Sequence, residues 1–212
     1  GPKRLRPVGE TEFVNGVAAM SASGGFGPTM TNAGIVSFAD LTMGDAVEEV
    51  LVAHLAAAPD RFRGIRHASG WDASDKVRNS HTYPSEGLLG EARFREGLAK
   101  LGSMGLSFDA WLYHPQLAEL TDLAKAHPDV PIVLDHFAGP LGIGPYEGKR
   151  DEIKEHWKKD IAALAECDNV HAKIGGNNMA INGFGWHKRD TPPTSEELAA
   201  ATKDYYLHAI DC

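Results

Sequence analysis

The feature that most constrains the fold is an alternation of short β-branched or aromatic runs with longer amphipathic stretches. Five short runs lie at residues 34–41, 62–67, 106–114, 131–136 and 170–175. The stretches between them carry apolar residues at three- and four-residue spacing, which is the period of a helix packed on one face. Strands that alternate with helices predict right-handed crossovers and a mostly parallel sheet buried on both faces. The fold class is therefore α/β, and the five strands fit either an open doubly wound sheet or part of an eight-stranded barrel.

Several of the expected helices have recognisable ends. The clearest helices are expected at residues 45–58, 91–101, 115–126 and 151–167, and a last one begins at Ser195. Thr194 is a typical N-cap residue, and Glu196 and Glu197 place negative charge in the first turn that follows it. Pro115 suits the first position of a helix, where its missing N–H has no intrahelical partner. No repeat or low-complexity linker interrupts the pattern, which predicts one domain over residues 1–212.

Charge and composition exclude several classes of function. Lys and Arg total 21 against 29 for Asp and Glu, and the formal net charge of -8 disfavours a surface that neutralises nucleic-acid phosphates. No apolar run approaches the roughly 20 residues that a bilayer span requires, so no membrane partner is expected. The basic first ten residues lack the apolar core of a secretory signal, and only Cys167 and Cys212 occur. These features predict a cytoplasmic protein with reduced thiols and a small-molecule partner.

Polar, titratable residues follow four of the five predicted strands. The residues at these ends are Asp40, Arg66 and His67, Tyr113 and His114, and Asp135 and His136. Because the carboxyl ends of parallel strands meet at one edge, we expect His67, His114 and His136 to converge on one concave site. Imidazole binds zinc or manganese, and it also moves protons near neutral pH. The alternative is that each histidine caps its strand by a hydrogen bond to a loop carbonyl.

Other motifs restrict the chemistry further. The glycine-rich segments at residues 24–28 and 139–148 match neither a dinucleotide-binding nor a Walker loop, and no G-x-S-x-G elbow occurs. We interpret 139–148 as a long active-site loop, and GFGWHKRD at 183–190 as either a lid or a loop with a packed tryptophan. His54, His127 and His156 fall on predicted helices or their ends and are expected to be surface or packing residues.

Five segments together resemble a known family. GIVSFADLT, FRGIRHASGWD, LSFDAWLYHPQL, IVLDHFAGPLGIGPY and HAKIGGNNM resemble the amidohydrolase superfamily, in particular its amidohydrolase-related branch of lactonases and decarboxylases. The resemblance runs from about Arg6 to Tyr206. Members of the superfamily are (β/α)8 barrels. The resemblance therefore implies a partial TIM-type barrel whose five parallel strands are the third to the seventh.

The resemblance also implies roles for individual residues. His114 matches the histidine at the end of the fifth barrel strand and His136 the one at the end of the sixth, positions that hold or neighbour a divalent metal in metal-binding members. Zinc is the expected metal, although some relatives use none. His67 matches a fourth-strand position that contacts metal or substrate. The residues expected to hold a substrate carboxylate or to form the pocket walls are Arg66, His67, Trp71, Tyr113 and Asn177.

The implied activity is that of a metal-dependent hydrolase that opens a lactone or similar cyclic ester with activated water. His114 and His136 would bind the metal or polarise the carbonyl. A decarboxylase of the same branch, which uses the same histidines, is one alternative. A catalytically inactive fragment or binding domain is another.

Two parts of the family pattern have no counterpart in the chain. Neither the His-x-His of the first strand nor the aspartate of the eighth is present, so the chain is expected to be incomplete at both ends. Judged from the usual size of such barrels, the parent would be an enzyme of roughly 300 residues. Two open sheet edges would leave the chain marginally stable, prone to aggregate, or paired with another chain, including a second copy.

Overall fold

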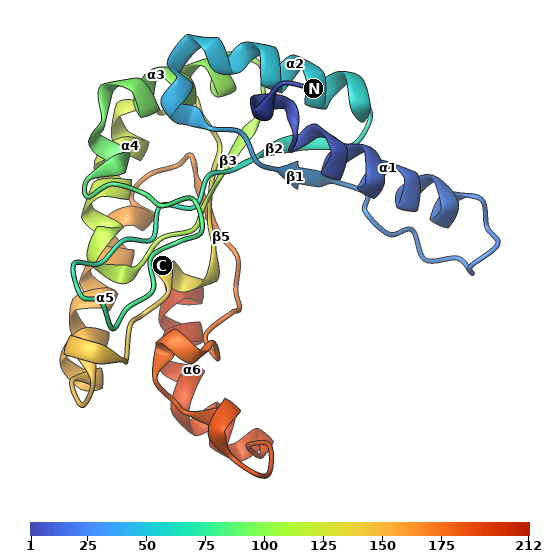
Figure 1. Cartoon of the computed structure of the whole chain (residues 1–212). Coiled ribbons are helices and arrows are strands. Elements are labelled where there is room, and N and C mark those ends of the chain that lie inside the picture. Colours follow the sequence, from blue (N-terminus) through green and yellow to red (C-terminus); the bar gives the residue numbers. More distant parts are fainter. The chain divides into compact units, whose positions relative to one another are not determined.

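The computed structural model describes residues 1–212 and contains five strands and six α-helices (Figure 1). The strands are β1 (Ile35–Ser37), β2 (Phe62–Arg66), β3 (Ser107–Ala110), β4 (Ile132–Leu134) and β5 (Val170–Ala172). The helices are α1 (Val8–Ala22), α2 (Glu48–Ala57), α3 (Ala92–Ser103), α4 (Leu117–Ala126), α5 (Arg150–Ala165) and α6 (Ser195–Asp211). The predicted alternation of strands and helices is confirmed.

The order of the strands decides between the two α/β architectures. Hydrogen-bonded neighbours follow the order of the chain, β1-β2-β3-β4-β5. The pairs β1/β2, β2/β3 and β4/β5 are parallel, with Ile65 opposite Phe108 and Leu134 opposite Ala172. A doubly wound sheet would reverse its strand order at a switch point, whereas a (β/α)8 barrel keeps sequential order. The open sheet therefore matches part of a TIM-type barrel, with β1 and β5 as its two edge strands.

The chain divides into two compact units. Unit 1 contains residues 1–67, 91–109 and 129–131, and unit 2 contains residues 68–90, 110–128 and 132–212. A single domain that is incomplete at both ends stays a prediction.

Unit 1 buries one face of α3 and of its strands. Phe94, Leu98, Ile65 and Phe108 are fully buried in its core. Gly97 lies where a Cβ atom would collide with the backbone of Leu41, so the absence of a side chain allows α3 to pack closely against the turn before α2.

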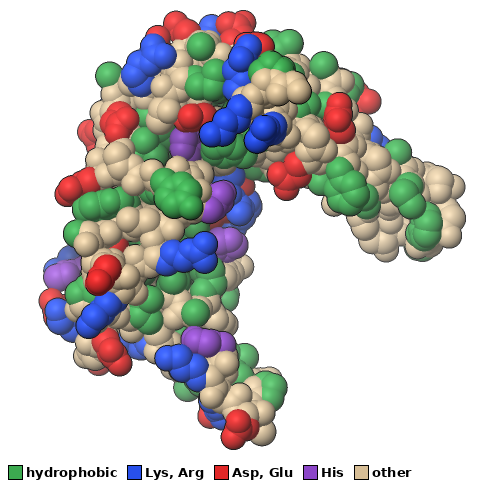
Figure 2. Space-filling model, in the orientation of Figure 1, with side chains coloured by type: hydrophobic (Ala, Val, Ile, Leu, Met, Phe, Trp, Pro, Cys, Tyr) green, Lys and Arg blue, Asp and Glu red, His purple; other side chains and the backbone are tan.

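The helix α1 packs beside α2 and β1 (Figure 1). The buried His54 of α2 joins them, with its Nδ1 2.8 Å from Thr11 Oγ1 and its Nε2 3.1 Å from the Phe38 carbonyl oxygen. The prediction that His54 has a packing or surface role is confirmed as packing. Phe13 and Met20 of α1 are large hydrophobic side chains that remain exposed. Figure 2 shows hydrophobic side chains at the surface of this part of the chain.

Unit 2 is built around α5. Its buried residues Ile153, Trp157, Ile161 and Leu164 fall on one helical face, which is the amphipathic pattern that predicted the helix. The Trp157 ring centroid lies 4.9 Å from that of Tyr205 on α6, which packs against α5. At the start of α6, Thr194 Oγ1 accepts the Glu197 N–H at 3.2 Å, and the Glu197 carboxylate accepts the Thr194 N–H at 2.8 Å. The predicted N-cap is confirmed, and it forms a complete capping box.

Several element boundaries differ from the predictions, and two of these differences have a local cause. The strand predicted at 106–114 ends at Ala110, because the chain then turns into a 3₁₀ turn over His114–Gln116 that precedes α4. The helix predicted at 45–58 is α-helical only from Glu48, since a 3₁₀ segment over Leu41–Val47 comes first. The Asp40 side chain accepts the Thr42 N–H at 3.0 Å and so starts the turn early.

None of the helices combines the length and the apolar character needed to cross a bilayer.

Candidate functional site

Polar side chains follow β3, β4 and β5 in unit 2. After β3 come Tyr113 and His114, after β4 come Asp135 and His136, and directly after β5 comes Lys173. Because parallel strands present their carboxyl ends at one edge of a sheet, this edge is the candidate site.

His114 is a buried imidazole in a fixed orientation. Its Nδ1 accepts the Leu141 N–H at 3.2 Å, and its ring centroid lies 5.3 Å from that of Tyr146. Burial lowers the pKa of His114 to about 4, because the charged form loses its hydration. The nearby Asp72 carboxylate opposes this shift only in part. The ring is therefore neutral at pH 7. Since Nδ1 accepts a hydrogen bond, the proton resides on Nε2, which is then a donor.

His136 begins a left-handed turn. The φ angles of His136, Phe137, Ala138 and Gly139 are 52°, 56°, 57° and 41°, a conformation that non-glycine residues rarely adopt. The half-buried His136 ring centroid lies 5.2 Å from that of Trp111, and a Cβ atom at position 176 would collide with the imidazole. Backbone strain of this kind concentrates at functional sites, which supports His136 as a functional residue.

Sequence reasoning missed Lys173. Its Nζ lies 3.0 Å from Asp135 Oδ1, and the Asp135 side chain is fully buried, whereas the Lys173 side chain is 46% exposed. The signal was present, because Lys173 interrupts an apolar run at the end of β5, but that run was assigned as a whole to the strand. The Lys173–Asp135 ion pair places the half-exposed ammonium group of Lys173 at the carboxyl-terminal edge of the sheet.

Asn177 follows β5 on the loop after Lys173. Its side chain is 1% exposed, and neither Nδ2 nor Oδ1 has a hydrogen-bond partner. An unpartnered buried amide costs roughly 1–3 kcal/mol, and such groups call for a water, ion or ligand as partner.

A second missed residue, Gln116, organises the loop after β2. Its Nε2 donates to the Ser69 carbonyl at 2.7 Å, and its Oε1 accepts the N–H groups of Trp71 at 3.0 Å and Tyr113 at 3.2 Å. The Tyr113 hydroxyl donates to the Arg78 carbonyl, and burial raises the pKa of that hydroxyl. Gln116 and Tyr113 thus hold the loop that carries Trp71. Nothing in the spacing of Gln116, at the predicted start of a helix, indicated this role.

Trp71 lines a cleft of about 630 Å³ in unit 2, which we call the Trp71 cleft. Tyr146 also lines it, and the Tyr146 hydroxyl donates to Asp72 Oδ2 at 2.7 Å. Tyr146 therefore contacts the cleft and the His114 ring.

Two of the predicted site residues, Arg66 and His67, belong to unit 1. His67 Nδ1 accepts the Leu41 N–H at 3.2 Å, and its ring packs between those of Phe38 and Phe94, with centroids at 5.3 and 5.4 Å. His67 therefore repeats the hydrogen-bonding arrangement of His114. The other five, Trp71, Tyr113, His114, His136 and Asn177, belong to unit 2. The convergence of His67 with His114 and His136 stays a prediction.

The residues present do not form a complete metal site. No group of three or more His, Cys, Asp or Glu side chains is placed to hold a metal ion. The Nδ1 lone pair of His114 is occupied by the Leu141 N–H, and its Nε2 carries a proton. His114 as oriented is thus a hydrogen-bond donor, and a metal ligand would need the other tautomer.

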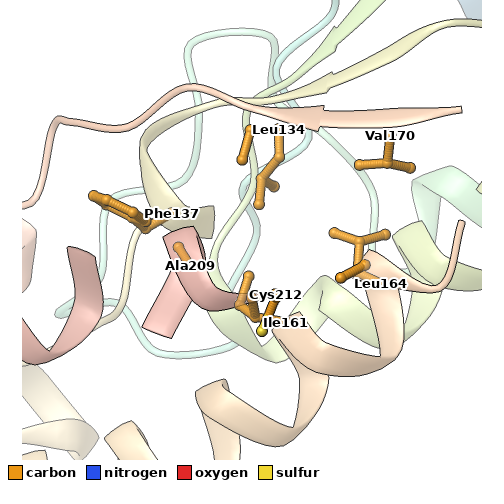
Figure 3. A pocket seen from close by; sticks show the side chains of 9 residues that line it. Leu134, Phe137, Ile161, Leu164, Val170, Ala209 and Cys212 are labelled. Carbon is orange, nitrogen blue, oxygen red and sulfur yellow. The ribbon is translucent and has the colours of Figure 1, made fainter. Parts of the chain in front are cut away.

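A separate apolar pocket of about 170 Å³ lies between β4, β5, α5 and the end of α6. Figure 3 shows the side chains around it, including Leu134, Phe137, Ile161 and Cys212. Cys212 and the buried Cys167 are both free. This pocket lacks charged groups and is not a candidate catalytic site.

Comparison with known proteins gives the following similarities. The sequence model of a family described as amidohydrolase matches residues 30–209. An uncharacterized protein of Sinorhizobium fredii, y4mH, is 33% identical over 198 residues, which cover 92% of this chain and 58% of that protein.

Two solved structures of an amidohydrolase from Burkholderia multivorans share the fold. The form with bound zinc has 20% identity and a TM-score of 0.68, covering 96% of this chain and 60% of that one. The form with bound HEPES has 18% identity and a TM-score of 0.64, covering 93% of this chain and 59% of that one. The chain thus spans less than two thirds of the length of these relatives.

Proposed function

Because the chain belongs to the amidohydrolase family, we propose that it is a hydrolase and that it opens a lactone or similar cyclic ester. The observation that carries the proposal is the state of His114, a buried neutral imidazole whose Nδ1 is fixed and whose Nε2–H is free to donate. A fixed donor in a water-poor site stabilises the oxyanion that develops when water attacks an ester carbonyl.

In the proposed reaction, water adds to the carbonyl carbon of the lactone, and the bond between that carbon and the ring oxygen breaks. The water oxygen stays in the new carboxyl group, and the ring oxygen leaves with a proton as a hydroxyl. His114 donates to the carbonyl oxygen through Nε2, and His136 polarises the same group or moves a proton. Their positions after β3 and β4 support these roles.

The proposed substrate is a small molecule that carries a carboxylate. Arg66 and His67 would hold this carboxylate, since a guanidinium pairs with it through two hydrogen bonds. Trp71, Tyr113 and Asn177 would form the walls of the pocket. The unpartnered Asn177 amide supports its assignment, because a substrate oxygen or hydroxyl would satisfy it.

Members of this superfamily are typically metal-dependent, and one Burkholderia structure contains zinc. Zinc is therefore proposed as the metal of the complete enzyme. The residues of this chain do not complete such a site, and no step of the proposed reaction uses zinc.

We also propose a cytoplasmic location, in accord with the two free thiols. The open edges of β1 and β5 are proposed to pair with another chain, with a second copy as one partner.

The test is a hydrolysis assay on sugar lactones and carboxylated lactones, with acid release as the readout. We expect His114→Ala to lower kcat by roughly 100- to 1000-fold, the usual effect of removing an oxyanion donor. His171→Ala, at an exposed position of β5, is the matched control and should keep full activity.

Three outcomes would contradict the proposal. Unchanged activity in His114→Ala would remove this residue from the mechanism. Release of carbon dioxide instead of a ring-opened acid would identify a decarboxylase. Substrate binding without turnover would identify a binding domain.

A further inference from the structure

We propose that the Trp71 cleft is a binding site for a small organic cation, such as an alkylammonium group. The cleft lies in unit 2 between the loop after β2, the start of α4 and the loop that carries Tyr146. Its volume of about 630 Å³ falls in the range of small-molecule sites. Its polar and aromatic lining consists of Trp71, Asp72, Ser74, Glu86, Gln116, Glu119 and Tyr146.

The charge of the lining is of one sign. Asp72, Glu86 and Glu119 contribute three carboxyl groups, and no Lys, Arg or His lines the cleft. A cleft lined by one sign of charge between low-dielectric walls concentrates ligands of the opposite charge. The absence of a basic side chain leaves these carboxylates without an internal counter-ion in the cleft.

Glu119 shows the strain of this arrangement most clearly. Its Oε2 is shielded from solvent and has no hydrogen-bond partner. Burial raises the pKa of Glu119, and the neighbouring charge of Glu86 raises it further. A bound cation would offset the repulsion between Glu86 and Glu119 and would place positive charge beside the unpartnered Oε2.

Trp71 gives the cleft its selectivity for organic cations. Its half-exposed indole lies on the wall, and the face of an indole attracts ammonium groups within about 6 Å of its centroid. The Trp71 backbone is held by Gln116 Oε1 at 3.0 Å, so the aromatic wall is fixed before a ligand arrives.

A bare metal ion fits this cleft poorly. The described side chains include no metal-binding group of three His, Cys, Asp or Glu residues. The Asp72 carboxylate is already engaged, with Oδ2 accepting the Tyr146 hydroxyl at 2.7 Å and Oδ1 accepting the Ser74 N–H at 2.8 Å. Asp72 therefore contributes negative charge, while Glu86 and Glu119 remain for direct contact. A sugar or other neutral polyol would leave the repulsion between them in place.

This binding requires no catalysis. Tyr146 places the cleft next to His114, and Trp71 is also a proposed wall of the substrate pocket. Glu86 and Glu119, which supply the negative charge for cation binding, have no role in the proposed hydrolysis. The absence of hydrolase activity would leave the inference intact, and the absence of cation binding would leave the hydrolase proposal intact.

The test compares choline with 3,3-dimethylbutan-1-ol, a neutral molecule of the same shape, by titration against the purified protein. The readouts are isothermal calorimetry and the indole N–H resonance of Trp71. We expect choline to bind at least tenfold more tightly than the alcohol, with an affinity that falls as salt is added. Glu119→Gln and Glu86→Gln should each weaken binding about 2- to 5-fold, and Trp71→Leu should weaken it by a similar factor.

Glu166→Gln, an exposed carboxylate at the end of α5, is the matched control and should bind choline like the parent protein. The two glutamine variants preserve side-chain shape, and circular dichroism checks that each variant folds. Equal affinity for choline and the alcohol would overturn the proposal. So would tighter binding of glucose than of choline, or glutamine variants that behave like the control.

Discussion

Gln116 offers a sharp test of how the site is held, because one buried side chain satisfies three backbone groups. Replacing it by methionine keeps a similar volume and an unbranched side chain but removes every hydrogen bond. The Ser69 carbonyl and the N–H groups of Trp71 and Tyr113 would each lose a partner now at 2.7–3.2 Å. Gln116 itself is buried, so water cannot easily replace the amide.

The size of the effect follows from these three bonds. A net contribution of about 1 kcal/mol for each gives a loss of about 3 kcal/mol in the free energy of unfolding for Gln116→Met. For a chain of this length, that loss lowers Tm by roughly 6–12 °C. Gln116→Glu should lie between the parent and the methionine variant, because a carboxylate still accepts from the two N–H groups but cannot donate to the Ser69 carbonyl.

Urea denaturation followed by circular dichroism measures this loss. Lys125→Met, at an exposed position on the same helix, is the control and should change stability by less than about 0.5 kcal/mol. If Gln116→Met lowers the free energy of unfolding no more than Lys125→Met does, the three hydrogen bonds do not hold the loop in solution. The claim that Gln116 fixes Trp71 in the wall of the cleft would then be wrong.

Two further predictions concern the histidines. Because burial puts the folded-state pKa of His114 at about 4, below its unfolded value of about 6.5, its contribution to stability is complete above pH 6.5 and is lost as the pH falls toward 4. The loss should total about 3 kcal/mol in urea denaturation and should be absent in His114→Gln; a profile that is flat in both proteins would contradict the burial argument. Gly176→Ala should displace the His136 imidazole and force a φ of 82° on a residue with a side chain, so we expect reduced activity and a loss of about 1–2 kcal/mol. Unchanged chemical shifts of the His136 ring would refute this.

The fold was largely predictable because its signals are local. The alternation of apolar runs and amphipathic helices, and the cap at Thr194, depend on neighbouring residues. Boundaries were missed where a hydrogen bond from the backbone to a side chain starts a turn, as Asp40 does before α2 and Gln116 does after β3. Periodicity alone left the barrel and the doubly wound sheet equally open. The family resemblance favoured the barrel, and the observed strand order confirms it.

The candidate residues could be named from the sequence, their roles stay predictions, and their chemical state was not predictable. The strand-end rule and the family resemblance identified His114 and His136. The proton on His114 Nε2, however, depends on a contact with Leu141, which is 27 residues away. The left-handed turn after β4 was not predictable, because Phe137 and Ala138 adopt a conformation against their intrinsic preference. Lys173 was missed because a single charged residue does not change the apolar pattern that predicted the strand at 170–175.

The turn that begins at His136 has a consequence at some distance from the site. Its peptide units are rotated so that the Phe137 carbonyl oxygen faces the core of unit 2, where the Trp157 Nε1–H donates to it at 2.7 Å. A single indole on α5 thus fastens the main chain that presents the imidazole. A substitution of Trp157 would remove this hydrogen bond and free the backbone beside His136, so the proposed activity would fall without any change in the residues proposed to touch the substrate.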